Sequence, residues 1–144
     1  GQLLDLEGGY QLATAMEAAL KIKELTYIHT EGLNSGELKH GPLALIDEES
    51  HVIIMCTKDA LIDKARSVVQ QICARKGKPI AILSENDPEI EAAADVVVKV
   101  PSTVDCLQGV INVIPMQLLS YHLAVVRGNN VDCPRNLAKS VTTQ

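Results

Sequence analysis

Short runs of aliphatic residues recur along the chain and mark its candidate strands. They are residues 3–6 (LLDL, interrupted by Asp5), 52–56 (VIIMC), 80–83 (IAIL) and 96–100 (VVVKV). The runs are rich in Val and Ile and do not alternate strictly with polar residues. That pattern is typical of strands whose two faces are both covered, as in a parallel sheet.

Longer segments with helical periodicity separate these runs. They are residues 14–28, 59–75 and 105–127. We expect Gly77 and Pro79 to end the second helix and Gly128 to end the third. Pro115 lies inside the third helix, where a proline can bend it. Strands and helices that alternate in this way predict right-handed crossovers and a three-layer α/β domain with a parallel sheet.

Length and composition are consistent with this prediction and exclude some functions. The chain has 144 residues, 47% of them hydrophobic and 22% charged, which suits one globular domain. It contains no Phe or Trp, only three Tyr, and a net charge of −5. A nucleic-acid protein would need aromatic platforms or a basic surface. We therefore expect no nucleic-acid partner, while a local group of lysines can still bind a small anion.

The cysteines predict a compartment. Cys56, Cys73, Cys106 and Cys133 are far apart and form no C-x-x-C pair, which is typical of thiols in a reducing cytosol. Nothing resembles a signal peptide, and no apolar run has the ~18–20 residues of a membrane helix. We expect a cytoplasmic protein without membrane contact. Because the chain begins with Gly, we also expect it to be a piece of a longer protein.

The first helical segment contains a possible proton-transfer group. In EAALKIKEL, Glu17, Lys21 and Glu24 are four and three residues apart, so all three share one helix face. They can form an ordinary solvated ion-pair face. Alternatively, the lysine sets the protonation of a carboxylate that shuttles protons.

A glycine-rich segment follows, GLNSGELKHGPLALID at residues 32–47. Its glycines and the Gly41-Pro42 pair predict a tight loop leading into a short helix. Glu37, Lys39 and His40 lie within it. Histidine side chains titrate near neutral pH, so His40 can exchange a proton with a sugar oxygen, or it can cap the turn structurally. The other histidines have no metal-ligand spacing.

The last residues, NNVDCPRNLAKSVTTQ at 129–144, are unusual for a chain end, because ends are commonly polar and frayed. Lys139 is flanked by Leu137, Ala138 and Val141. If this segment folds inward, Lys139 is partly desolvated and its free amine can attack a carbonyl. If the segment stays loose, Lys139 is an ordinary solvated lysine.

Motifs of other enzyme classes are absent from the sequence. There is no G-x-G-x-x-G after a strand, no phosphate-binding G-x-x-x-x-G-K-[ST] and no G-x-S-x-G. Serine-nucleophile and metal-hydrolase functions therefore have no support.

Three stretches carry a resemblance to a known family. They are residues 17–47, containing ELKHGPLAL, residues 104–128, VDCLQGVINVIPMQLLSYHLAVVRG, and residues 131–141, VDCPRNLAKSV. They resemble the C-terminal end of the glutamine–fructose-6-phosphate aminotransferase (isomerizing), or glucosamine-6-phosphate synthase, family. The likeness runs over residues 10–141.

The resemblance implies an architecture and a reaction. Residues 1–128 would be the second sugar-isomerase (SIS) domain, a flavodoxin-like parallel sheet, and residues 129–144 an active-site tail docked by its Pro, Arg and apolar residues. The family makes glucosamine 6-phosphate from fructose 6-phosphate and glutamine-derived ammonia, for UDP-N-acetylglucosamine synthesis. It needs no metal or organic cofactor. The other partners implied are a first SIS domain, a glutaminase domain and a second subunit of a homodimer.

The resemblance also implies residue roles. The glutamate that moves a proton between C1 and C2 falls on Glu24, with Lys21 assisting. The Schiff-base lysine falls on Lys139. The ring-opening histidine falls on His40, which would reach a neighbouring subunit's site. Because the family grips the sugar phosphate with its first SIS domain, we expect this piece alone to be poorly active or inactive.

A second class of function is also considered, a non-catalytic phosphosugar-binding or dimerisation SIS module. Such a module does not need the PRNLAKSV segment, so Glu24, His40 and Lys139 together favour the enzyme.

Overall fold

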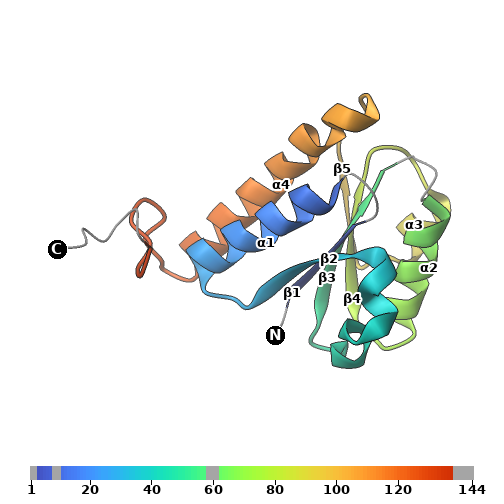
Figure 1. Ribbon diagram of the computed structural model, residues 1–144, viewed down its shortest axis with the longest axis horizontal. Helices are drawn as coiled ribbons and strands as arrows, with labels where there is room; N and C mark the ends of the chain where they lie inside the picture. The colour runs from blue at the N-terminus through green and yellow to red at the C-terminus, as the bar shows by residue number, and fades with distance from the viewer. Residues whose placement is uncertain (1–2, 8–10, 58–61, 138–144) are drawn as a thin grey trace.

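A computed structural model describes residues 3–7, 11–57 and 62–137, and shows a parallel sheet between two layers of helices (Figure 1). The strands, in the order β2-β1-β3-β4-β5, are β1 (Leu3–Glu7), β2 (Thr30–Asn34), β3 (His51–Cys56), β4 (Lys78–Leu83) and β5 (Val96–Lys99). The helices are α1 (Leu12–Thr26), α2 (Ile62–Cys73), α3 (Pro88–Ala93) and α4 (Asp105–Val126), with 3-10 helices η2 (Ser35–His40) and η3 (Pro42–Leu45). Neighbouring strands pair in parallel.

Each face of the sheet has its own hydrophobic core. Helices α1 and α4 cover one face, where Ala15, Ala18 and Ile22 of α1 pack with Ile53 of β3 and Met116 of α4. Helices α2 and α3 cover the other face, with their own buried aliphatic side chains. The predicted three-layer α/β fold with a parallel sheet is therefore confirmed.

The four predicted strands and three predicted helices are present, with bounds that differ by a few residues. Two elements were not predicted. The edge strand β2 has the sequence TEGLN, in which Glu, Gly and Asn are poor strand formers, so tertiary pairing with β1 overrides local preference. Helix α3 is short, and its buried Ile90 alone gives no periodicity.

The ends of α2 and α4 show why their glycines are there. Gly128 adopts a left-handed φ of 72° and its N–H donates to the Val125 carbonyl, as predicted for a helix stop. After α2 the left-handed residue is Lys76, with φ 62°. Gly77 serves close packing instead, because a Cβ there would come within 2.8 Å of the Ile72 side chain.

Helix α4 has an unusual distribution of side chains. Its buried positions, four residues apart, include Gln108, Asn112 and Ser120, whereas its exposed positions are mostly apolar. By length and composition α4 could cross a membrane, so the expectation that no segment reaches that length is wrong, although one such helix is weak evidence for a span. The polar stripe contacts protein, and the apolar stripe faces outward.

An ion pair joins α2 to the start of α3. Asp87 caps α3 by accepting a hydrogen bond from the Ile90 N–H at 3.1 Å, and its other oxygen accepts from Arg66 Nε at 3.0 Å. The Asp87 side chain is only 7% exposed. Burial alone would raise the pKa of this carboxyl, but the Ile90 N–H and the Arg66 guanidinium outweigh burial and hold the pKa below its ordinary value.

We predict that Asp87→Asn keeps the helix cap but lowers the free energy of unfolding at pH 7 by about 1–2 kcal/mol. Because the folded-state pKa is depressed, this contribution is present above about pH 4 and is lost as the pH falls through the folded-state pKa. Urea denaturation at pH 7 and at lower pH measures it. The control is Asp63→Asn, whose side chain also pairs with Arg66 but is 85% exposed. An equal decrease in the free energy of unfolding in both variants, or a decrease that does not depend on pH, would contradict the prediction.

Candidate active site

Helix α1 is held closely between the sheet and α4. Small side chains at Ala15, Ala18 and Ala19 are buried along it. A Cβ on Gly32 of β2 would lie 2.7 Å from the Met16 nitrogen, and a Cβ on Gly109 of α4 would lie 2.7 Å from Thr14 Oγ1. Both glycines are therefore needed for close approach, and they fix where the side chains of α1 lie.

A buried chain of amides joins α1 to α4. The Asn112 amide donates to Gln11 Oε1 at 3.3 Å, and the Gln108 amide donates to Asn112 Oδ1 at 3.0 Å. All three side chains are essentially inaccessible to solvent. Such hydrogen bonds are directional, so they set the position of α4 relative to α1. The two helices each follow a strand, run in the same direction and end side by side (Figure 1).

Near the C-terminal end of α1 lies the predicted charged face. The Lys21 ammonium donates to Glu24 Oε2 at 2.9 Å and lies 3.5 Å from Glu17 Oε1. Glu24 is 19% exposed and Glu17 is 44% exposed. The hydrogen bond to Glu24 raises the pKa of Lys21 above its ordinary value, more than partial burial lowers it. Lys21 is thus a fixed positive charge beside the Glu24 carboxylate, and not a ready proton donor.

The segment after α4 returns to this same end of α1. The Asn129 amide donates to the Leu25 carbonyl at 2.9 Å. Further on, the Arg135 backbone N–H donates to the Tyr27 hydroxyl at 2.8 Å, and the Arg135 guanidinium lies 4.2 Å from the centre of the Tyr27 ring. The sequence analysis expected the tail's Arg to dock but missed Tyr27, because only the folded chain brings residues 27 and 135 together.

Lys139, the predicted Schiff-base residue, lies outside the described residues, which end at Leu137. Its role stays a prediction. The described part of the tail, through Leu137, is folded: Asn130 Oδ1 accepts hydrogen bonds from the N–H groups of Asp132 and Cys133.

His40 lies away from Glu24. It ends η2, which follows the carboxyl end of β2, whereas α1 ends before the amino end of the same strand (Figure 1). The predicted loop is two 3-10 helices, with Leu38 buried and Glu37, Lys39 and His40 exposed. One chain therefore does not bring His40 and Glu24 together, and an exposed His40 is available to another surface.

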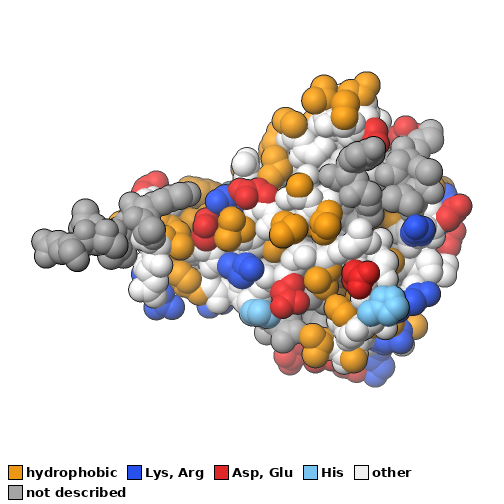
Figure 2. Space-filling view, in the orientation of Figure 1, with side chains coloured by type: hydrophobic (Ala, Val, Ile, Leu, Met, Phe, Trp, Pro, Cys, Tyr) orange, Lys and Arg blue, Asp and Glu red, His pale blue; other side chains and the backbone are white. Residues whose placement is uncertain are grey.

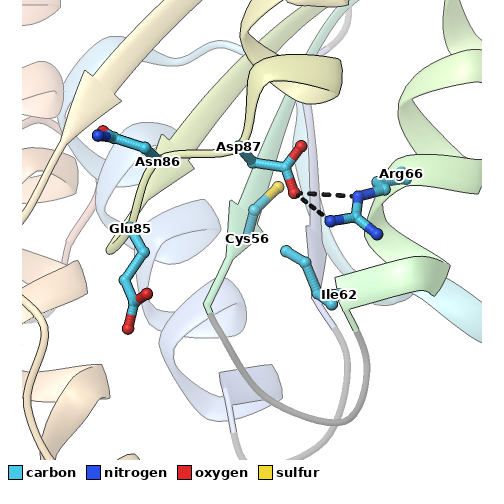
Figure 3. Close-up of a pocket in the computed structure, with 6 residues that line it drawn as sticks. All are labelled: Cys56, Ile62, Arg66, Glu85, Asn86 and Asp87. Carbon is cyan, nitrogen blue, oxygen red and sulfur yellow. Dashed lines mark hydrogen bonds and ion pairs between the residues drawn. The ribbon is translucent and has the colours of Figure 1, made fainter.

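Ligands of open parallel sheets commonly bind at the carboxyl ends of the strands, and here that edge of the sheet has a hollow of about 160 Å³ (Figure 3). Six residues line it: Cys56, Ile62, Arg66, Glu85, Asn86 and Asp87. Two of them are acidic, and the Arg66 guanidinium is held by Asp87. Among the described lining residues, negative charge therefore exceeds the positive charge that could face a phosphate. No group of three or more metal-ligating side chains occurs among the described residues.

The fold and the sequence define the class. The family model of the SIS domain matches residues 8–127, and the chain belongs to this family of sugar-isomerase domains. Among solved structures it superimposes on the C-terminal domain of glucosamine-fructose-6-phosphate aminotransferase from Francisella tularensis with a TM-score of 0.82 and 38% identity, covering 90% of this chain and 37% of that one. A tagatose-6-phosphate ketose/aldose isomerase from Escherichia coli, at 21% identity and a TM-score of 0.82, shows the same fold over 91% of this chain and 37% of that one.

The particular relatives are aminotransferases. Over 99% of its length the chain is 59% identical to the glutamine–fructose-6-phosphate aminotransferase [isomerizing] of Encephalitozoon cuniculi, 55% to isoform 2 of Homo sapiens and 55% to the enzyme of Saccharomyces cerevisiae. It spans 20–21% of the length of these relatives. By sequence, the chain is homologous to the isomerase part of these proteins.

We predict that Lys21 titrates above its ordinary pKa because of Glu24, and NMR detection of the lysine ε carbon during a pH titration measures this. Glu24→Gln should lower the Lys21 pKa. The matched control is Glu17→Gln, which should lower it less because the Glu17 oxygen is farther away and more exposed. A larger effect from Glu17→Gln would contradict the pairing.

Proposed function

We propose that this chain is the C-terminal isomerase domain of a glutamine–fructose-6-phosphate aminotransferase, which makes glucosamine 6-phosphate from fructose 6-phosphate and glutamine-derived ammonia. The 59% identity to such an enzyme supports the assignment. The observation that carries it is the Lys21–Glu24 pair beside the folded segment that leads to Lys139. A sensor module would need neither.

In this proposal the chemistry is divided between Glu24 and Lys139. The Lys139 amine attacks the C2 carbonyl of open-chain fructose 6-phosphate, and loss of water gives an imine. Ammonia then adds to C2 of this imine and displaces the Lys139 amine, which frees the lysine and leaves the sugar as its C2 imine. A carboxylate base at Glu24 moves a proton between C1 and C2. The Lys21 ammonium, held 2.9 Å from Glu24, stabilises the charged carboxylate before transfer and orients its oxygens.

His40 is assigned to ring opening in the site of a neighbouring subunit. Its exposure and its distance along the fold from Glu24 support this division, because a histidine that served its own chain's site would lie beside Glu24. The proposal therefore includes a homodimer whose sites each use residues of two subunits.

The outward apolar face of α1 and α4 supports a further domain partner. Its exposed side chains are Met16, Leu20, Leu107, Val110, Ile114, Leu118, Tyr121 and Val125. Figure 2 shows hydrophobic side chains gathered over these helices. Contiguous apolar surface of this kind marks an interface, and we assign it to the preceding sugar-isomerase domain of the longer protein, which also supplies the phosphate grip.

The proposal includes a cytoplasmic location and a reaction without a metal or an organic cofactor. The four cysteines lie in the described part of the chain as thiols, which suits a reducing compartment.

In the full-length protein, Lys139→Ala and Glu24→Gln should each reduce the conversion of fructose 6-phosphate to glucosamine 6-phosphate by about a hundredfold or more, since each removes a group that acts on the reacting atoms. Glutaminase activity, measured separately, is the control for folding. Lys23→Ala, an exposed lysine on the same helix, should leave both activities unchanged. Full activity in both site variants would refute the proposal.

The isolated chain should bind an environment-sensitive dye such as anilinonaphthalene sulfonate through the α1/α4 face. A polypeptide that also contains the preceding domain should bind less dye per mole, because that domain covers the face. Vesicle flotation of the two polypeptides tests lipid as the alternative occupant of α4. Undiminished dye binding, or flotation of the longer polypeptide, would contradict the domain assignment.

A further inference from the structure

Arg135 contacts Tyr27 at two points of different kinds. Its backbone N–H donates to the Tyr27 hydroxyl, and its guanidinium lies over the face of the same ring. The hydrogen bond fixes the distance between the Arg135 backbone and the Tyr27 hydroxyl, at the edge of the ring. The cation–π contact fixes the position of the Arg135 guanidinium above the face of the ring. Together the two contacts define both the position and the orientation of Arg135, which a single contact would not do.

The backbone of Tyr27 is in a conformation that does not favour tyrosine. Tyr27 caps the C-terminal end of α1 with φ 60° and ψ 19°, and its N–H donates to the Lys23 carbonyl. Glycine or asparagine is the usual residue in this left-handed conformation. A bulky aromatic residue is disfavoured in this conformation. We infer that the contacts of the Tyr27 side chain compensate for the cost of the left-handed backbone.

A second tether holds the start of the same segment. Gly128 turns the chain at the end of α4, and the next residue, Asn129, donates its amide to the Leu25 carbonyl. Carbonyls in the last turn of a helix lack a partner within the helix. Asn129 satisfies one of them, so residue 129 is attached to the last turn of α1 and residue 135 to the Tyr27 cap that follows it.

We propose that Tyr27 and Arg135 form a latch that positions the C-terminal segment for catalysis. The inference rests on the proposed function, in which Lys139 is the Schiff-base residue. Tyr27 is a positioning residue: it acts on Arg135, and through the chain on Lys139, without touching the substrate.

The geometry of the latch matches the reaction. Tyr27 caps the C-terminal end of α1, three residues after Glu24, so both residues belong to the same end of this helix. Lys139 follows Arg135 by four residues, and four residues span at most about 14 Å. In this proposal, Arg135 held on Tyr27 tethers the chain that leads to Lys139 to the end of α1 that carries Glu24.

The test uses the full-length protein with Tyr27→Gly, Arg135→Gln and a control, Arg75→Gln. Glycine relieves the left-handed backbone at position 27 while it removes the ring and hydroxyl, so the fold is retained or stabilised. Arg75 is exposed, and its guanidinium donates to the Gln71 carbonyl of α2. Activity on fructose 6-phosphate, the thermal midpoint and the rate of cleavage after Lys139 by a lysine-specific protease, which does not cut at position 135, are measured for each.

We expect Tyr27→Gly and Arg135→Gln to lower kcat by between about tenfold and a hundredfold, with KM changed by less than about twofold, because misplaced reacting groups slow the chemical step. Cleavage after Lys139 should be faster in both, and the thermal midpoint of Tyr27→Gly should not fall. Tyr27→Phe keeps the ring but loses the hydroxyl, so its kcat should lie between the wild-type value and that of Tyr27→Gly. Arg75→Gln should match the wild type.

Unchanged kcat in Tyr27→Gly and Arg135→Gln would overturn the latch proposal. A decrease of kcat in Arg75→Gln as large as in these two variants would also overturn it. Lys139→Ala in the same assay separates the two proposals. If Lys139→Ala is inactive while both latch variants have wild-type kcat, only the latch is wrong. If Lys139→Ala is fully active, the proposed function is wrong.

Discussion

The close packing of α1 between the sheet and α4 is the constraint on which the site depends. Alanines on α1, together with Gly32 on β2 and Gly109 on α4, bring three backbones closer than larger side chains would permit. The buried Gln11–Asn112–Gln108 amides then fix the two helices relative to each other. As a result α1 and α4 end together, and the chain that leaves α4 meets the last turn of α1, where Glu24 and Tyr27 lie.

This arrangement explains why α4 is polar inside and apolar outside. Its inner stripe provides the amides that fix α1, and its outer stripe is left for another surface. The chain spans about 20% of the length of its Encephalitozoon cuniculi relative, and in the proposed full-length protein another domain covers the outer apolar stripe. The mean hydropathy of α4 alone does not distinguish this use from a membrane span. Its buried amides show that the inner stripe packs against the N-terminal end of α1.

Much of the fold could be predicted from the sequence, because unbroken Val and Ile runs and long helical periods are local signals. The edge strand β2 and the short α3 lack such signals, since pairing with β1 and a single buried Ile90 specify them. For the site, the spacing of Lys21 and Glu24 predicted their contact, which the structure shows at 2.9 Å. The Tyr27–Arg135 contact spans more than a hundred residues, and no periodicity reveals it. Lys139 and His40 keep the roles that the family resemblance gives them as predictions.

The central claim is that Lys139 forms a covalent imine with the sugar beside Glu24. Borohydride reduction of the full-length protein in the presence of fructose 6-phosphate, followed by peptide mass spectrometry, tests it most directly. The account predicts one hexitol-phosphate adduct, on the peptide that contains Lys139, and none after substitution of that lysine. An adduct on Lys21 or another lysine, or none at all under conditions in which the enzyme turns over, would contradict it.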